Sequence, residues 1–163
     1  MSSSPLRFAS EIENLAGGKA RAEFVCVSAP ANCIDLGEDQ RFQSVFFYGI
    51  HAVEVLLEIL GEHVGEVQVS RGKRATTIQI DFLNATGSIQ LIRDVDEFYG
   101  VHTYSRNGQQ DLTISLDGSY YPRLLRFLFE EFYTGSRTVA LTSTLQAIEI
   151  LDKAEQAAIR AET

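Results

Sequence analysis

Length, composition and charge already exclude several classes of protein. The chain has 163 residues, 45% of them hydrophobic and 22% charged, which suits one folded domain with its own core and excludes a disordered chain. Its longest apolar run, residues 45–60, is interrupted by tyrosine, histidine and two glutamates, so no membrane-spanning helix is expected. A net charge of −8 repels phosphate backbones, and nucleic acid is therefore not expected as a partner.

The N-terminal part predicts a short helix, a strand and a loop. Ser3 or Ser4 can cap a helix over residues 4–15, and a pair of glycines follows this segment, which favours a helix. Residues 21–29 alternate and contain valine and phenylalanine, which indicates a strand. Residues 30–40 combine proline, asparagine, aspartate and glycine, which is typical of a loop.

Residues 44–60 carry the clearest helical pattern. Apolar side chains recur at spacings of four and three and form one stripe: Phe46, Ile50, Val53, Leu57 and Leu60. A second line along the same helix is polar and consists of His51, Glu54 and Glu58. We expect this polar line to face solvent or a wet cleft.

From residue 64 to residue 116 the apolar period changes to two, which predicts several strands. Asn107-Gly108 is a strong hairpin signal. Connections such as residues 71–74 and 84–86 are too short for parallel crossovers. We therefore expect an antiparallel meander with one apolar face and one face of threonine, glutamine, serine and aspartate.

Two helices are expected to close the chain. The first, residues 119–133, has an apolar side that should face the core: Tyr121, Leu124, Leu125, Leu128 and Phe132. The second opens at Ser143, with Gln146 in a capping-box position. Its inward residues should be Ile148, Leu151, Ala154 and Ala158. The whole chain then forms a single α+β domain, a predominantly antiparallel open sheet with helices packed on one face.

Three segments, in this order, carry a resemblance to a known family. They read SPLRFASEI, FFYGIHAVEVLLEILG, and SYYPRLLRFLFEEFYTGSRTVALTSTLQAIEILDKAEQAAI. Together they resemble the C-terminal domain of the glucose–fructose oxidoreductase and inositol dehydrogenase family (Gfo/Idh/MocA). The resemblance covers nearly the whole chain and implies a C-terminal domain of the glyceraldehyde-3-phosphate-dehydrogenase-like type.

The family implies a Rossmann domain that precedes this one, NAD or NADP as cofactor, and a sugar, polyol or related small hydroxy compound as substrate. It also implies a homo-oligomer that forms through the open sheet face. The sequence has no GxGxxG after a strand, so we expect the Rossmann domain to be missing. This chain alone should bind no cofactor and be inactive. The alternative is a stand-alone ligand-binding or oligomerisation module.

His51 is the first candidate for catalysis. It matches the family's helix histidine, and an imidazole that titrates near neutrality can donate or accept the proton of a hydroxyl. A core histidine satisfied by a neighbour is the alternative. The family often places an aspartate four residues earlier, where this chain has Phe47, which puts alcohol oxidation in doubt. Glu54 occupies the place of the family's second acid and could pair with His51.

Three further residues are candidates for substrate binding. Tyr48 could contribute a hydroxyl near His51 or could pack in the core. Arg7 and Arg123 could anchor a carboxylate or phosphate, or could be solvated helix residues. No metal is expected, because the histidines lack the spacing of a metal site.

The compartment follows from the cysteines and the N-terminus. Cys26 and Cys33 match neither a CxxC pair nor a zinc knuckle. The first residues lack the basic start and apolar run of a secretory signal. We therefore expect a reducing, cytoplasmic location.

Overall fold

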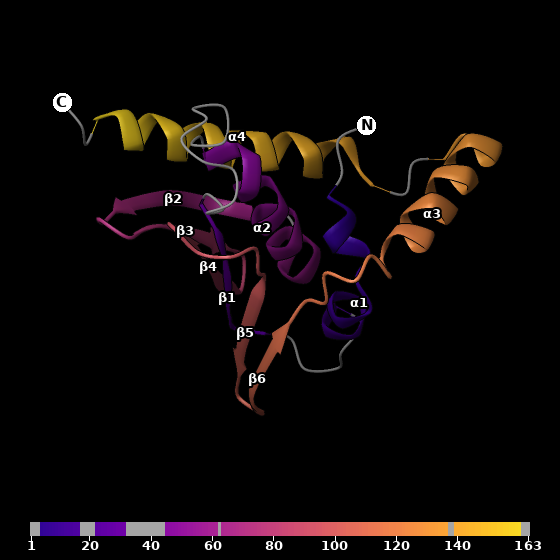
Figure 1. Cartoon of the computed structure of the whole chain (residues 1–163), viewed down its shortest axis with the longest axis horizontal. Coiled ribbons are helices and arrows are strands. Elements are labelled where there is room, and N and C mark those ends of the chain that lie inside the picture. Colours follow the sequence, from indigo (N-terminus) through magenta and orange to yellow (C-terminus); the bar gives the residue numbers. More distant parts are fainter. Residues whose placement is uncertain (1–3, 17–21, 32–44, 62, 137–138, 161–163) are drawn as a thin grey trace.

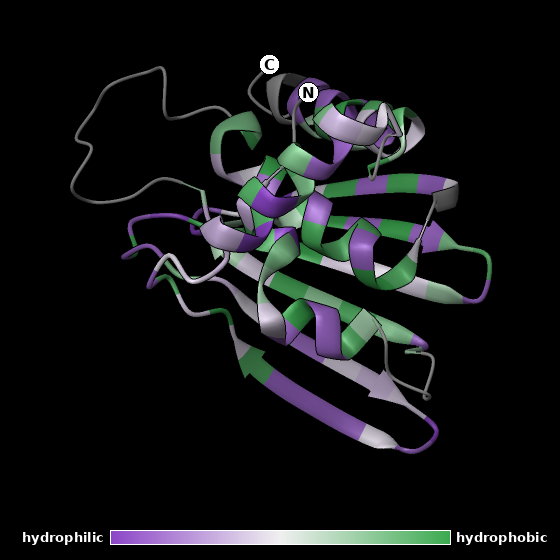
Figure 2. Ribbon diagram, turned by 90° about the vertical axis from the view of Figure 1, so that its right-hand side faces the viewer, coloured by the Kyte–Doolittle hydropathy of each residue, from purple (hydrophilic) through white to green (hydrophobic). Residues whose placement is uncertain are grey.

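The chain forms one sheet covered by helices on one side (Figures 1 and 2). The computed structural model describes residues 4–16, 22–31, 45–61, 63–136 and 139–160. The prediction of an α+β domain with a largely antiparallel sheet is confirmed. Within the described residues, none of the helices combines the length and apolar character needed to cross a bilayer.

Six strands build the sheet in the order β2-β3-β4-β1-β5-β6. Their bounds are β1 Phe24–Pro30, β2 His63–Arg71, β3 Ala75–Phe82, β4 Ala85–Ile92, β5 Gly100–Ser105 and β6 Gly108–Thr113. Neighbouring strands are antiparallel except β1 and β4, which run parallel. The hairpin predicted at Asn107-Gly108 joins β5 to β6.

The predicted uninterrupted meander is wrong at one place, because β1 lies between β4 and β5. Short connections establish β2-β3-β4 and β5-β6 as neighbours, but they say nothing about a strand from another part of the chain. Three elements separate β1 from its parallel neighbour β4 in the sequence: α2, Val45–Leu60, then β2 and β3. A connection of this length permits parallel pairing, which a hairpin does not.

The core lies between the sheet and the helices. Alternate residues of β3 are buried, as the period of two predicts. α2 packs on β1 and β4 and against α4, Leu141–Arg160. Gly49 permits this approach, because a Cβ at that position would lie 2.9 Å from Leu151 Cδ2.

The polar line predicted along α2 is only partly exposed. Glu58 is exposed, but the side chain of Glu54 is fully buried. The helix is therefore covered on more than its apolar stripe, because the N-terminal segment packs over its polar side.

The helix predicted over residues 4–15 is divided in two. A 3-10 helix, η1 Pro5–Phe8, is followed by α1, Ser10–Ala16, and the extended backbone of Ala9 separates them. Ser4 caps η1, because its hydroxyl accepts a hydrogen bond from the Leu6 amide. The predicted glycine stop at residues 17–18 and most of the predicted loop at residues 30–40 lie outside the described residues.

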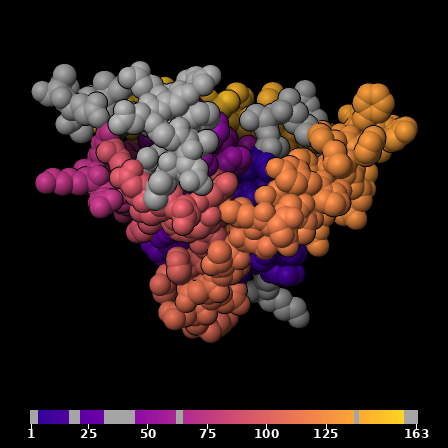
Figure 3. Space-filling model, viewed as in Figure 1, coloured from indigo at the N-terminus to yellow at the C-terminus, as the bar shows by residue number. Residues whose placement is uncertain are grey.

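The closing helices depart most from the expected packing. α3, Tyr121–Thr134, ends at Gly135, which has a φ of 67°, and it has no buried residue. Its predicted inward side is therefore largely exposed, with Phe132 at 85%, and the helix projects from the body (Figure 3). Periodicity reveals an apolar face but does not show what covers it.

α4 begins two residues before the predicted cap, so the expected capping box at Ser143 does not open it. Its predicted inward stripe is confirmed at Leu151 and Ala154, which are buried, but is wrong at Ile148, which is 45% exposed. Ala147 and Ile150 are buried as well.

Candidate functional site

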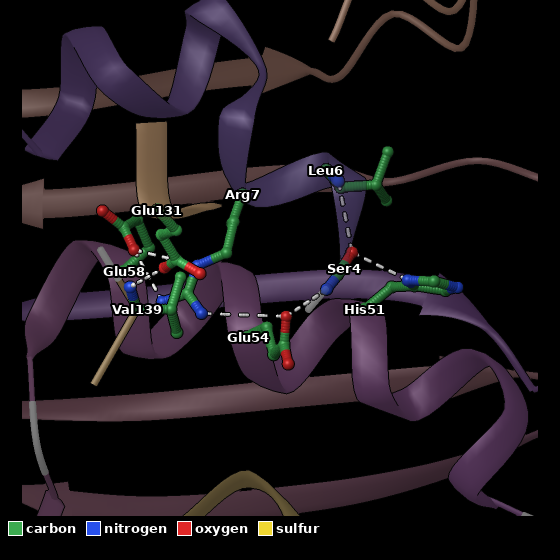
Figure 4. Close-up of polar contacts among 8 residues, drawn as sticks. All are labelled: Ser4, Leu6, Arg7, His51, Glu54, Glu58, Glu131 and Val139. Carbon is green, nitrogen blue, oxygen red and sulfur yellow. Dashed lines mark hydrogen bonds and ion pairs between the residues drawn. The ribbon is translucent and has the colours of Figure 1, made fainter. Parts of the chain in front are cut away.

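His51 lies in the middle of α2 beside the N-terminal segment. Its Nδ1 lies 2.7 Å from Ser4 Oγ, and its ring meets that of the buried Tyr99 edge to face, with centroids 5.9 Å apart. The other ring nitrogen points away from Ser4 and its neighbours (Figure 4). Burial lowers the pKa of His51 below its ordinary value, because desolvation favours the neutral imidazole.

A buried ionic network holds Ser4 in place (Figure 4). The Ser4 amide donates to Glu54 Oε2, and Arg7 NH1 lies 3.8 Å from the same oxygen. Arg7 also donates to Glu58 Oε2 through Nε at 3.1 Å and NH2 at 2.7 Å. The Glu54 side chain is 0% exposed and that of Arg7 5%. Charges buried to this extent must be paired with opposite charges. Because Arg7 lies in the N-terminal segment and the glutamates lie on α2, this pairing holds the N-terminal segment against α2.

Glu54 supports His51 through Ser4. The serine side chain contacts the imidazole and the serine backbone contacts the carboxylate. Sequence reasoning identified Ser4 only as a helix cap and did not identify Tyr99. No local pattern connects either residue with His51, because both contacts join segments about 50 residues apart.

The two predicted arginine anchors lie together, away from His51. Arg7 and Arg123 line a cavity of about 550 Å³ between η1, α1, α2, α3 and α4. Arg123 NH1 lies 2.6 Å from Glu13 Oε2, and Arg7 is held by Glu58. An anionic ligand in this cavity would have to displace a carboxylate, so the cavity is not a ready-made phosphate site.

Tyr48 and Phe47 form the start of α2. Tyr48 is buried, and its ring meets that of Phe47 edge to face at 4.9 Å. Phe47 is 43% exposed and lies one turn before His51. The position at which the resembling family often has an aspartate is therefore an exposed aromatic residue.

Polar residues also gather on the open face of the sheet. His102 Nδ1 lies 2.8 Å from Asp111 Oδ1, beside a shallow cavity of about 390 Å³ that Ser28 also lines. Burial raises the pKa of the Cys26 thiol on the same face, so this cysteine is a poor nucleophile. Among the described residues, no three histidine, cysteine, aspartate or glutamate side chains form a cluster that could hold a metal ion.

The sequence contains no GxGxxG. Arg7 and Arg123, the two arginines that could bind a pyrophosphate, are each paired with a glutamate.

Solved structures match the fold over most of the chain. D-galactose-1-dehydrogenase from Rhizobium etli is 17% identical, with 90% of this chain and 57% of its own chain covered at a TM-score of 0.67. Myo-inositol 2-dehydrogenase from Lactobacillus plantarum is 10% identical, with 98% and 60% covered at a TM-score of 0.71. GenD2 from gentamicin A biosynthesis, solved in complex with NAD, is 14% identical, with 95% and 60% covered at a TM-score of 0.69.

No protein-family model matches the chain, and no curated protein sequence matches it. At these identities the likeness shows a shared fold. The chain spans 57–60% of the length of the three solved dehydrogenases.

Proposed function

We propose that this chain is the C-terminal, substrate-side domain of an NAD(P)-dependent oxidoreductase of the Gfo/Idh/MocA family that acts on a sugar, polyol or related hydroxy compound. The proposal is supported by the shared fold with part of galactose and inositol dehydrogenases. The observation that carries it is the orientation of His51 on α2: Nδ1 contacts Ser4, and the other ring nitrogen points away from Ser4 and its neighbours.

Oxidation of a secondary alcohol removes a hydride from carbon and a proton from the attached oxygen. NAD(P), held by a domain outside this chain, would accept the hydride, and a basic group of that domain would take the proton. His51 would hold and polarise the substrate oxygen through its outward nitrogen. Because Phe47 stands where the family often has an aspartate, no carboxylate assists His51 from that position, and Ser4 takes over the task of orienting the ring.

The remaining roles follow from the same proposal. A nucleotide-binding domain is the partner that completes the site. The polar open face, which carries the His102–Asp111 pair, is the contact between copies of the protein. Light scattering that shows a strict monomer at high concentration would count against this contact.

Saturation-transfer difference NMR on this chain tests the proposal, because it detects the millimolar affinity expected of half a site. We expect signals from myo-inositol or D-galactose that disappear in His51→Ala and persist in His102→Gln, whose side chain lies on the open face. We expect no binding of NAD or NADP in calorimetry. Tight cofactor binding by this chain alone, or no polyol or sugar signal, would overturn the proposal.

A further inference from the structure

We infer that Ser4 is the positioning residue of His51: its hydroxyl donates to Nδ1 and thereby places the proton of the neutral imidazole on the outward nitrogen, Nε2. The geometry rests on the 2.7 Å separation of Ser4 Oγ and His51 Nδ1. A neutral imidazole carries one proton, so the nitrogen that accepts a hydrogen bond leaves the other protonated.

The direction of the hydrogen bond follows from the partners of the Ser4 hydroxyl. Its oxygen already accepts a hydrogen bond from the Leu6 amide at 3.2 Å. Ser4 is buried, and in the described part of the chain His51 Nδ1 is the acceptor within reach of its single proton. If Nδ1 were protonated, the proton of the Ser4 hydroxyl could not donate to it. A buried donor without an acceptor costs free energy.

The hydroxyl cannot easily rotate or move away. The Ser4 amide is bound by Glu54 and its carbonyl accepts from the Arg7 amide at 3.4 Å. Arg7 in turn joins Glu54 to Glu58. The Ser4 backbone is therefore held by α2 at its amide and by η1 at its carbonyl. The buried charges hold the serine, and the serine orients the imidazole.

The consequence for the reaction rests on the proposed function. With its proton on Nε2, neutral His51 presents a hydrogen-bond donor to the substrate oxygen and has no lone pair there to accept a proton. His51 therefore holds and polarises the oxygen of a carbonyl or hydroxyl. Removal of a hydroxyl proton requires a different group or the minor tautomer.

Long-range proton–nitrogen NMR of the imidazole rings tests the assignment without any substrate. The chain has three histidines, and the variants His63→Gln and His102→Gln identify the signals of His51. At a pH well above its pKa, we expect one His51 form with Nδ1 unprotonated and accepting a hydrogen bond, and with Nε2 protonated. A protonated Nδ1, or the mixture of tautomers found in free histidine, would overturn the inference.

Matched variants separate the hydrogen bond from the stability of the fold. In Ser4→Ala the His51 nitrogen signals should move to those of the free mixture, and in Ser4→Thr, which keeps the hydroxyl, they should return towards those of the native chain. Ser10→Ala makes the same change at an exposed serine that contacts Glu11, and it should leave the His51 signals unchanged. If Ser4→Ala leaves them unchanged as well, Ser4 does not set the tautomer.

The result is independent of the proposed function. If the chain fails to bind polyols or sugars, the proposed function is wrong, but the tautomer assignment still holds. If NMR shows the other tautomer, the role of Ser4 is wrong, but the proposed substrate class is not affected.

Discussion

Replacing Glu54 by alanine gives the sharpest test of the buried network. The change removes the acceptor of the Ser4 amide and one of the two carboxylates that face Arg7. Both charged side chains are almost completely buried. The loss leaves the buried Ser4 amide without this acceptor and leaves Arg7 with the partly exposed Glu58 as its counter-charge. We therefore expect the cost of breaking a buried pair, about 3–5 kcal/mol, as the upper range.

The cost should appear as a large fall in melting temperature. For a chain of this size each kcal/mol lowers the Tm by about 2–4 °C, so Glu54→Ala should lower it by about 6–20 °C. Circular dichroism and urea unfolding measure both quantities. Glu54→Gln keeps an oxygen for the Ser4 amide and should cost clearly less than alanine.

An exposed ion pair supplies the matched control. Glu23 lies 2.9 Å from the Arg106 side chain, but both side chains are largely exposed. Glu23→Ala should therefore cost less than about 1 kcal/mol. If Glu54→Ala were no more destabilising than Glu23→Ala, the network would not fasten the N-terminal segment to α2, and the argument for Ser4 as a fixed residue would fail with it.

Three further predictions concern the site and the helices. Burial lowers the pKa of His51, so on acidification the unfolded chain binds a proton at this histidine before the folded chain does. The free energy of unfolding should therefore fall as pH drops below about 6.5, until the folded-state pKa is reached. Urea unfolding of His51→Gln should show a flatter dependence in this window. Phe47→Asp places a carboxylate one turn from His51 and should raise its pKa in an NMR titration; an unchanged pKa would contradict the proximity. Phe132→Ala on the exposed side of α3 should change stability by less than about 0.5 kcal/mol, whereas Ile150→Ala, which empties a fully buried position, should cost about 2–5 kcal/mol.

The sequence predicts what is local in this fold. Apolar spacing correctly places α2, and the period of two with short turns correctly predicts several strands in the region where β2 to β6 lie. The position of β1 could not be found in this way, because pairing between distant segments depends on side-chain packing across the sheet. The pattern of α3 was also recognised, but a helix that ends on the surface and a helix that enters the core can share the same periodicity.

For the same reason, the sequence suggests some residues of the candidate site and misses others. His51 was identified by its resemblance to a family histidine and Glu54 by its spacing from His51. The residue that contacts the imidazole, Ser4, is 47 positions away. The sequence pattern already explained Ser4 as a helix cap, and the structure confirms that local role. One side chain serves both purposes, and only the fold shows the second.

Helical periodicity fails at Glu54, and this failure is informative. Helical periodicity puts Glu54 on a polar line that should be wet, yet the structure buries it completely with Arg7. Two well-packed apolar residues would stabilise such a contact at least as well as an ion pair does. Departures of this kind are expected where a protein places polar groups for chemistry. Glu54 of this buried pair contacts Ser4, which in turn contacts His51, and for this reason we propose His51 and Ser4 as the centre of the functional site.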